Sequence, residues 1–368
     1  MLGAEVRRLE AVRWWSGDRC RVAALTLCAA HLLLAADSCT AQARRTTIPS
    51  INTPLVEWVA SRPHAAPDSL ATFDTAAGRT ATFAAMVDSL AGRNWSQAKR
   101  HARSIGYRLV MIHEGRRTFV VAADRGSSGR DPTIVLNLDP QRDLILGAPH
   151  VPFEPGTGEQ ALIFLRDLAG RAAIISGAHR CASRAFTACD GTTAVCGSLQ
   201  SYRDSDVGHN VATLYHVAHV RLAQRWPSSI VMSLHGMKED TEGVRTSVIV
   251  SNGIRADDTA LQTAATKFRT TVGRRISAPG KIVSCNLPAD SAFGFRTLCG
   301  YTNIQGRHVN GDSNACRVSV DEGTGRFIHV EQDWDVLQAY AEDWKQIGRH
   351  PFNKAFVRGL VKVLPRVR

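Results

Sequence analysis

The feature that most constrains this chain is an alternation of short apolar runs with helical segments, which begins near residue 107 and continues towards the C-terminus. Short runs rich in Val, Ile and Leu are typical of buried strands, and apolar stripes with a helical period are typical of helices that pack on a sheet. A chain that alternates in this way is expected to form an α/β domain. We therefore predict a mixed, mostly parallel sheet flanked by helices.

The expected elements can be placed by residue number. Two β-branched runs predict a hairpin at 107–112 and 118–123. Further strands are expected at 133–138, 143–148, 172–176, 229–234, 244–250 and 326–331. Helices are expected at 82–91, 95–104, 158–169, 207–225, 258–272, 334–346 and 351–362. Thr157 with Gln160, Ser205 or Asp206, and Asp257 have the residue types and positions of helix caps.

The first 43 residues have the pattern of a secretory signal peptide. A basic region precedes a mostly apolar run, Val22 to Ala36, and Ala41-Gln42-Ala43 has the small-x-small form of a cleavage site. The apolar run is short for a membrane span, so no stable span is expected after processing, although an N-terminal anchor is the alternative. We predict a helical N-terminal segment at 44–106 and a catalytic domain at 107–368.

Cysteine usage agrees with export. Nine cysteines occur, and an even number remains once residues 1–43 are removed: Cys181, Cys189, Cys196, Cys285, Cys299 and Cys316. An even number in an exported chain predicts disulfides, and a local Cys189–Cys196 closure is expected within a cysteine-rich excursion, residues 180–203. No C-x2-C pair occurs, which argues against a zinc finger. We therefore predict a periplasmic or extracellular bacterial protein.

Charge and missing motifs narrow the function. The formal net charge is +12, which favours anionic partners. Because the basic residues are spread along the chain and form no block of five, no nucleic-acid partner is expected. The sequence contains no HExxH, no Gly-x-Ser-x-Gly and no GxxxxGK[ST]. Thermolysin-like proteases, serine hydrolases and P-loop NTPases are therefore disfavoured.

Three histidines follow apolar runs directly: His150, His179 and His235. In an open α/β sheet, the loops at the carboxyl ends of the strands form the ligand crevice, so these histidines are well placed for function. Two carboxylates follow His150, namely Glu154 and Glu159. Two histidines and one carboxylate are a known catalytic zinc set that leaves one position open. The sequence leaves Glu154 and Glu159 as alternative ligands, and Glu159 has the simpler alternative role of stabilising a helix N-terminus.

Other polar residues are candidates for catalysis and substrate binding. Glu331 ends an expected strand and is the candidate general base, and His329 shares its face by the period of two. Arg180 has the chemistry to hold a substrate carboxylate in bidentate fashion. The further candidates for substrate binding are His179, Asp206 and His209.

The order of these motifs resembles a known group of enzymes. Pro149-His150 is followed by Glu-Pro-Gly-Thr-x-Glu at 154–159, then by Ser233-Leu-His-Gly, and finally by His329-Val-Glu. This arrangement, which covers about 143–335, resembles zinc-dependent amidohydrolases and exopeptidases of the phosphorylase/hydrolase-like fold. The group includes poly-γ-glutamate hydrolases, N-formylglutamate amidohydrolases, N-acetylmuramoyl-L-alanine amidases and zinc carboxypeptidases. The His-x-x-Glu of carboxypeptidases and the Gly-His-Gly-Gly of muramoyl amidases are absent.

The resemblance implies a zinc-dependent hydrolase that cleaves an amide or peptide bond. Zinc would be held by His150, His235 and either Glu159 or Glu154, and Glu331 would be the general base. Together with the positive charge, it implies an anionic or cell-wall-type substrate such as peptidoglycan or poly-γ-glutamate. The alternative from another class is a non-catalytic secreted protein that binds an anionic wall polymer on the same fold.

Overall fold

The structure is a computed structural model, and it describes residues 48–73, 75–237, 246–276, 281–293, 298–317 and 321–367. The contacts divide the chain into Met1–Thr47 and a compact unit, Ile48–Arg368. The predicted signal peptide, with three of the nine cysteines, lies outside the described residues. No helix in the described part of the chain has the length and hydropathy that a membrane crossing requires.

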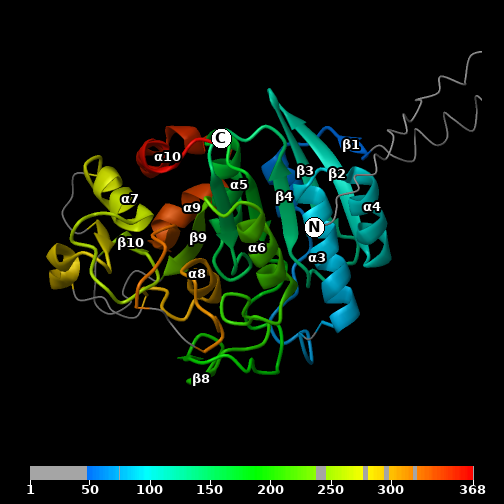
Figure 1. The fold of residues 1–368 in the computed structure, drawn as a ribbon, viewed down its shortest axis with the longest axis horizontal. Coiled ribbons are helices and arrows are strands. Elements are labelled where there is room, and N and C mark those ends of the chain that lie inside the picture. The colour runs from blue at the N-terminus through cyan, green and yellow to red at the C-terminus, as the bar shows by residue number, and fades with distance from the viewer. Residues whose placement is uncertain are drawn as a thin grey trace, which may run out of the picture. The chain divides into compact units, whose positions relative to one another are not determined.

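A ten-stranded sheet forms the centre of the compact unit (Figure 1). Its strands, in spatial order, are β1 (Ser50–Ile51), β2 (Tyr107–Glu114), β3 (Arg117–Asp124), β4 (Thr133–Asn137), β6 (Ala172–Ile175), β5 (Leu144–Ala148), β9 (Ile230–Met237), β12 (Phe327–Asp333), β10 (Val248–Ser251) and β11 (Ile282–Ser284). A separate small pair joins β7 (Thr192–Thr193) to β8 (Gln200–Ser201) within the excursion.

The sheet is mixed, as the sequence predicts. Strands β6, β5, β9 and β12 are parallel neighbours, and β1–β2 and β10–β11 are parallel pairs. The hairpin strands β2 and β3, together with β4, run antiparallel, and β10 runs antiparallel to β12. The predicted fold class, an α/β sheet flanked by helices, is therefore confirmed. The parallel centre brings the carboxyl ends of β5, β9 and β12 to one edge.

Helices cover both faces of the sheet, and the period of two along each strand separates the two layers. The helices are α2 (Leu55–Ala60), α3 (Ala77–Ala91), α4 (Trp95–Ser104), α5 (Thr157–Asp167), α6 (Leu214–Arg225), α7 (Ala264–Gly273), α8 (Ile304–Val309), α9 (Trp334–Glu342) and α10 (Pro351–Val363), with short 3-10 turns at η2 (Pro288–Phe293) and η3 (Ile347–Arg349).

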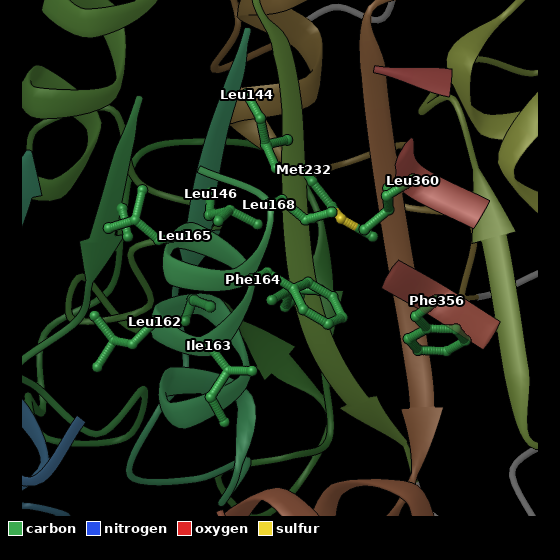
Figure 2. Close-up of a cluster of buried hydrophobic side chains, with 14 of the residues drawn as sticks. Leu144, Leu146, Leu162, Ile163, Phe164, Leu165, Leu168, Met232, Phe356 and Leu360 are labelled. Carbon is green, nitrogen blue, oxygen red and sulfur yellow. The ribbon is translucent and has the colours of Figure 1, made fainter. Parts of the chain in front are cut away.

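One core cluster lies between the sheet and the layer that contains α5 and α10. Figure 2 shows Phe164 of α5 and Phe356 of α10 among the strand residues Leu144, Leu146 and Met232. All five of these side chains are fully buried. Because each buried side chain of this size contributes roughly 1.5–3 kcal/mol, this layer is a main source of the stability of the sheet.

The second core cluster lies on the opposite face, which α3, α4, α6 and α8 cover. On β5, Ile145 points to this layer, whereas its neighbours Leu144 and Leu146 point to the first. On β9 and β12, Val231 and Phe327 belong to this second layer. The odd-numbered positions that follow them on the same strands therefore share the face that α6 and α8 cover.

Three of the predicted helix caps do not form. Helix α6 begins at Leu214, capped by Thr213, so Asp206 is not its cap. Helix α7 begins at Ala264, capped by Thr263, rather than near Asp257. Helix α5 is preceded by Gly156, in the left-handed region with φ of 92°, so the expected capping box does not form. For α6 and α7 several polar residues precede the helix, and tertiary contacts decide which of them caps it.

The six cysteines of the described chain form three disulfides: Cys181–Cys196, Cys189–Cys316 and Cys285–Cys299. The expected local closure between Cys189 and Cys196 was therefore wrong. The Cys189 bridge instead spans 127 residues, and sequence proximity cannot reveal such a partner. The disulfides are consistent with an exported protein.

Candidate metal centre

The strands β9 and β12 place the central polar residues side by side. Their parallel register pairs Glu331 with His235, and His329 with Ser233. All four residues occupy odd positions, so they lie on the face that α6 and α8 cover. His150 follows the carboxyl end of β5, the other neighbour of β9. Because β5, β9 and β12 are neighbouring parallel strands, their carboxyl ends bring these side chains close together.

A buried group of His150, Glu154 and His235 could hold a metal ion. His150 Nδ1 lies 2.9 Å from Glu154 Oε1, and His235 Nδ1 lies 3.5 Å from Glu154 Oε2. Each of the three residues is at most 3% exposed. In a tetrahedral zinc site, where the bonds measure 2.0–2.2 Å, neighbouring ligand atoms lie about 3.3 Å apart. The two observed separations are close to that spacing.

The unpartnered oxygen of Glu154 is direct evidence that this group fits a cation. Among the described residues, Oε2 is buried and has no hydrogen-bond partner, and its 3.5 Å contact with His235 is an ion-pair contact only. A buried carboxylate oxygen without a partner is costly. A metal ion bound by this group would satisfy it.

A second group, made of His150, Asp206 and His209, also has the spacing of a metal site. Its carboxylate, however, is fully used. Asp206 Oδ1 lies 2.8 Å from both His150 Nε2 and His209 Nδ1, and Oδ2 accepts two hydrogen bonds from Arg180, at 2.6 and 2.9 Å. Hydrogen bonding therefore accounts for this second group, and the unpartnered oxygen selects the first group as the better metal site.

The outer partners orient the two histidines. If His150 binds metal through Nδ1, its Nε2–H donates to Asp206, which fixes both the tautomer and the ring. His235 lies in the same way between Glu154 at Nδ1 and the hydroxyl of Ser233, 3.0 Å from Nε2. The backbone at Gly208 lies close to the His150 ring, since a Cβ atom there would be only 3.0 Å from Nε2. The ring therefore has little room to move.

The electrostatics agree with this assignment. Burial and Arg180 each lower the pKa of His150, but the carboxylates of Glu154 and Asp206 outweigh them and raise it above its usual value. Burial alone would raise the pKa of Glu154, whereas His150 and His235 hold it well below its usual value. Two flanking carboxylates favour the form of an imidazole that carries a proton on each nitrogen. A metal ion at Nδ1 would replace one of these protons.

Glu331 has the opposite environment. Its carboxylate is 3.0 Å from His329 Nε2, and burial raises its pKa to about 8. Burial also lowers the pKa of His235 and of His329 to about 4, so both rings are neutral near neutral pH. Gly300, with φ of 67°, packs directly on the His329 ring, where a side chain would come within 2.7 Å.

A cavity of about 620 Å³ opens onto this group. We call the histidine and charged residues that line it, all of them buried or half-buried, its floor: His150, Glu154, Arg180, His209, His235, His329 and Glu331. Its walls include the segment Thr192–Val195 of the excursion and the segment that contains Leu298. The ligand-sized cavity therefore meets the candidate metal group at the carboxyl ends of the parallel strands.

The remaining predicted residues take different places. Glu159 lies in the first turn of α5. Burial raises its pKa, and hydrogen bonds from backbone N–H groups partly oppose this shift. It is not part of the group formed by His150, Glu154 and His235. The structure thus brings Glu154, and not Glu159, to the two histidines. His179 is half-buried, accepts a hydrogen bond from the Cys181 N–H and does not line the cavity. Arg180 lines the cavity, but it is already paired with Asp206.

Several residues around the cavity were not singled out in the sequence. Tyr202 stacks on His209 with ring centroids 3.7 Å apart, and Phe153 lies under the Arg180 guanidinium. Trp334 begins α9 only three residues after Glu331. Its short distance in sequence from the predicted general base could have identified Trp334 as a residue near the site. The position of Tyr202 depends on how the excursion folds back, and the sequence carries no local signal for it.

Comparisons with known proteins add little. No family model matches the chain. A search of curated proteins also finds no match. Among solved structures, a bacteriophage poly-γ-glutamate hydrolase is similar, with a TM-score of 0.30 and 14% sequence identity over 64% of this chain and 88% of that chain. This similarity is too low to place the chain in that family or to transfer its activity.

Proposed function

We propose that this protein is a zinc-dependent hydrolase that cleaves an amide or peptide bond. The observation that carries the proposal is the unpartnered oxygen of Glu154, buried between His150 and His235 on the floor of a ligand-sized cavity. Two histidines and a carboxylate suit zinc and leave a fourth position open, as catalytic zinc sites do. His150, Glu154 and His235 would hold the ion.

A zinc ion held there would supply Lewis-acid polarisation of a substrate carbonyl and would favour ionisation of a water molecule near neutral pH. Glu331 is placed beside His235 and faces the cavity. It takes a proton from the water that attacks the carbonyl carbon and gives a proton to the leaving nitrogen as the carbon–nitrogen bond breaks. Its raised pKa favours this exchange, because the carboxyl group then gains and loses a proton near neutral pH.

The other polar residues keep the site in position. Asp206 fixes the ring of His150, and Arg180 holds Asp206 through two hydrogen bonds. Arg180 Nη1 also lies 3.7 Å from Glu154 Oε1, so its charge helps to keep that carboxylate ionised. Arg180 would therefore act mainly through these two carboxylates. Its predicted role as a clamp for a substrate carboxylate stays a prediction.

Export is part of the proposal. The pattern of residues 1–43 and the three disulfides support a periplasmic or extracellular location. Peptidoglycan and poly-γ-glutamate, expected from the positive charge, stay predictions as substrates. The alternative function, binding of an anionic wall polymer without turnover, uses the same cavity.

The metal content of the oxidised mature protein, residues 44–368, tests the proposal. We expect about one zinc per chain in the wild type and less than about a tenth of that in Glu154→Gln. A panel of peptide and N-acyl amide substrates is then tested with the wild type and with Glu331→Gln. Zinc without any turnover on the panel, together with polymer binding that survives Glu331→Gln, would favour the binding protein. Absence of zinc after reconstitution would contradict both the metal site and the hydrolase.

A further inference from the structure

Large apolar side chains are exposed at an unusual place. Among the described residues, five are exposed: Phe186, Val195, Leu199, Trp334 and Val361. The first three belong to the excursion, and Val195 and Trp334 also line the cavity. Val195 is 40% exposed and Trp334 is 37% exposed. Two exposed apolar side chains therefore share the concavity that contains the candidate metal group.

Exposed apolar side chains inside a cavity differ from those on a convex surface, because a bound ligand displaces the water around them. A scattered apolar side chain on a convex surface needs no explanation. A ligand that fills a cavity, in contrast, removes apolar wall area from water and gains roughly 25 cal/mol for each Å² removed. Val195 and Trp334 therefore offer binding free energy only to a ligand that brings apolar surface to them.

Cross-links and packing hold the wall in this form. Cys181–Cys196 ties the residue after Val195 to the residue after Arg180. Cys285–Cys299 fixes the segment that contains Leu298. Leu298 also packs on a small core cluster that includes Met237 and Cys299. Both Leu298 and Met237 line the cavity, so the apolar wall rests on a packed base.

The charged residues of the cavity lie on its floor and are occupied with one another. Arg180 is bonded to Asp206, His150 lies between two carboxylates, and Glu331 is bonded to His329. The floor is thus suited to the polar, reacting part of a ligand. Val195, Leu298 and Trp334 in the wall are suited to a different, apolar part of the same ligand.

We propose that Val195, Leu298 and Trp334 form an apolar subsite that takes an aliphatic or aromatic group carried next to the cleaved bond. The substrate class is therefore an amide or peptide with an apolar group adjoining the scissile carbonyl or nitrogen. This inference rests on the proposed hydrolase function, because that function defines the bond that is cleaved. The subsite itself does not need turnover.

Two hydroxamates test the subsite in the zinc-loaded protein, because a hydroxamate binds a metal centre without being hydrolysed. By calorimetry, octanohydroxamate is expected to bind at least about tenfold more tightly than acetohydroxamate, since each buried methylene contributes about 0.8 kcal/mol. Trp334→Ser and Val195→Ser are each expected to reduce this ratio about fivefold. They leave the affinity for acetohydroxamate nearly unchanged.

Leu199→Ser is the matched control. Leu199 is 73% exposed on the same excursion, but it does not line the cavity. Its substitution should leave the ratio at the wild-type value. A ratio near one in the wild type, or a ratio that Leu199→Ser lowers as much as Trp334→Ser does, would overturn the subsite.

A second measurement separates this inference from the proposed function. If the protein binds no zinc, the hydrolase proposal fails, and the subsite is tested in the metal-free protein with N-phenyl-1-naphthylamine, a neutral fluorescent probe. We expect saturable binding in the wild type that Trp334→Ser weakens at least fivefold and Leu199→Ser does not change. No saturable binding, or equal binding in all three proteins, would contradict the subsite.

Discussion

Two clusters of buried histidines in this protein invite comparison. One contains His150 and His235 at the carboxyl ends of the parallel strands. The other contains His216 and His219 of α6 with His308 of α8, and its ring centroids lie 5.6–6.0 Å apart. His216 and His219 are almost fully buried, as His150 and His235 are, whereas His308 is half-buried. Among the described residues, Glu154 Oε2 beside the first cluster and His216 Nδ1 and His219 Nε2 in the second are buried without a hydrogen-bond partner.

Carboxylates distinguish the two clusters. Glu154 and Asp206 lie on either side of His150, and together they raise its pKa. In the described part of the chain, no carboxylate is hydrogen-bonded to His216, His219 or His308. Burial lowers the pKa of His216 to about 3 and that of His219 well below its usual value. Burial alone therefore makes neutral packed rings, whereas burial beside carboxylates makes a site that attracts a cation.

The sharpest test of this comparison is a matched pair of substitutions. His235→Ala should abolish zinc binding and lower hydrolysis by at least about a thousandfold, because it removes a ligand. His219→Ala should retain about one zinc per chain and near-normal turnover. Metal analysis and steady-state kinetics measure both. Loss of zinc in His219→Ala with the fold intact by circular dichroism would break the distinction between the clusters.

Glu331→Gln should give the next largest effect. It removes the proton acceptor but keeps the shape of the side chain, so kcat should fall by about 10²–10⁴-fold. Zinc content should stay at the wild-type level, since Glu331 is not in the His150–Glu154–His235 group. Asp335→Asn, which changes an exposed residue of α9, serves as the control with unchanged kcat. Normal turnover in Glu331→Gln would remove Glu331 from the reaction.

Asp206→Asn should have a smaller effect. The carboxylate orients His150 and is held by Arg180, so its loss should weaken zinc affinity by about 10–100-fold without abolishing binding. Competition with a chelator measures this affinity. Asp88→Asn, which changes a surface carboxylate paired with Arg221, should leave it unchanged. If Asp206→Asn removed zinc as completely as His235→Ala, Asp206 would itself be a ligand.

The carboxylate-free cluster predicts a change in stability with pH. His216 has a lowered pKa in the folded protein, so below pH 6.5 the unfolded chain binds a proton that the folded chain does not. The free energy of unfolding should therefore fall as pH decreases from about 6.5 towards about 3, with an upper limit near 1.4 kcal/mol per pH unit for this residue. Above pH 6.5, His216 should contribute no pH dependence.

Urea titrations of the metal-free protein between pH 7 and pH 5 measure this slope. His216→Phe should reduce it, and His113→Gln, which changes an exposed histidine of β2, should not. A slope that His216→Phe leaves unchanged would show that His216 is not responsible for it.

The sequence predicted the parts of the site that strands position. His150 follows a strand, and His235 and Glu331 lie near the ends of two others, so the rule for parallel sheets brings them to one edge. The sequence could not decide whether Glu154 or Glu159 lies beside the histidines, because Glu154 lies just before α5 and Glu159 lies in its first turn. The turn at Gly156 decides that choice, since it keeps Glu159 in α5 and leaves Glu154 beside the histidines.

Asp206 shows a second limit. Its residue type and position fit a helix cap, but α6 begins only at Leu214. The side chain instead bonds Arg180 and His150, which lie 26 and 56 residues away in the sequence. Local preferences cannot weigh such distant partners against a cap. The pairing of Cys189 with Cys316 could not be predicted for the same reason, because the two residues lie 127 positions apart in the sequence.

The positions of the disulfides have a consequence for the response of the protein to reduction. None of the six cysteines in the described residues lies within a strand of the ten-stranded sheet, and Cys181–Cys196 and Cys285–Cys299 each adjoin a segment that lines the cavity. The strands that carry His235 and Glu331 are thus joined by their paired backbones and by the packed core, with no cross-link inside them, whereas the cavity segments at Val195 and Leu298 each adjoin a disulfide. Reduction of the disulfides should therefore loosen the segments beside the cavity while breaking no bond between the strands of the sheet.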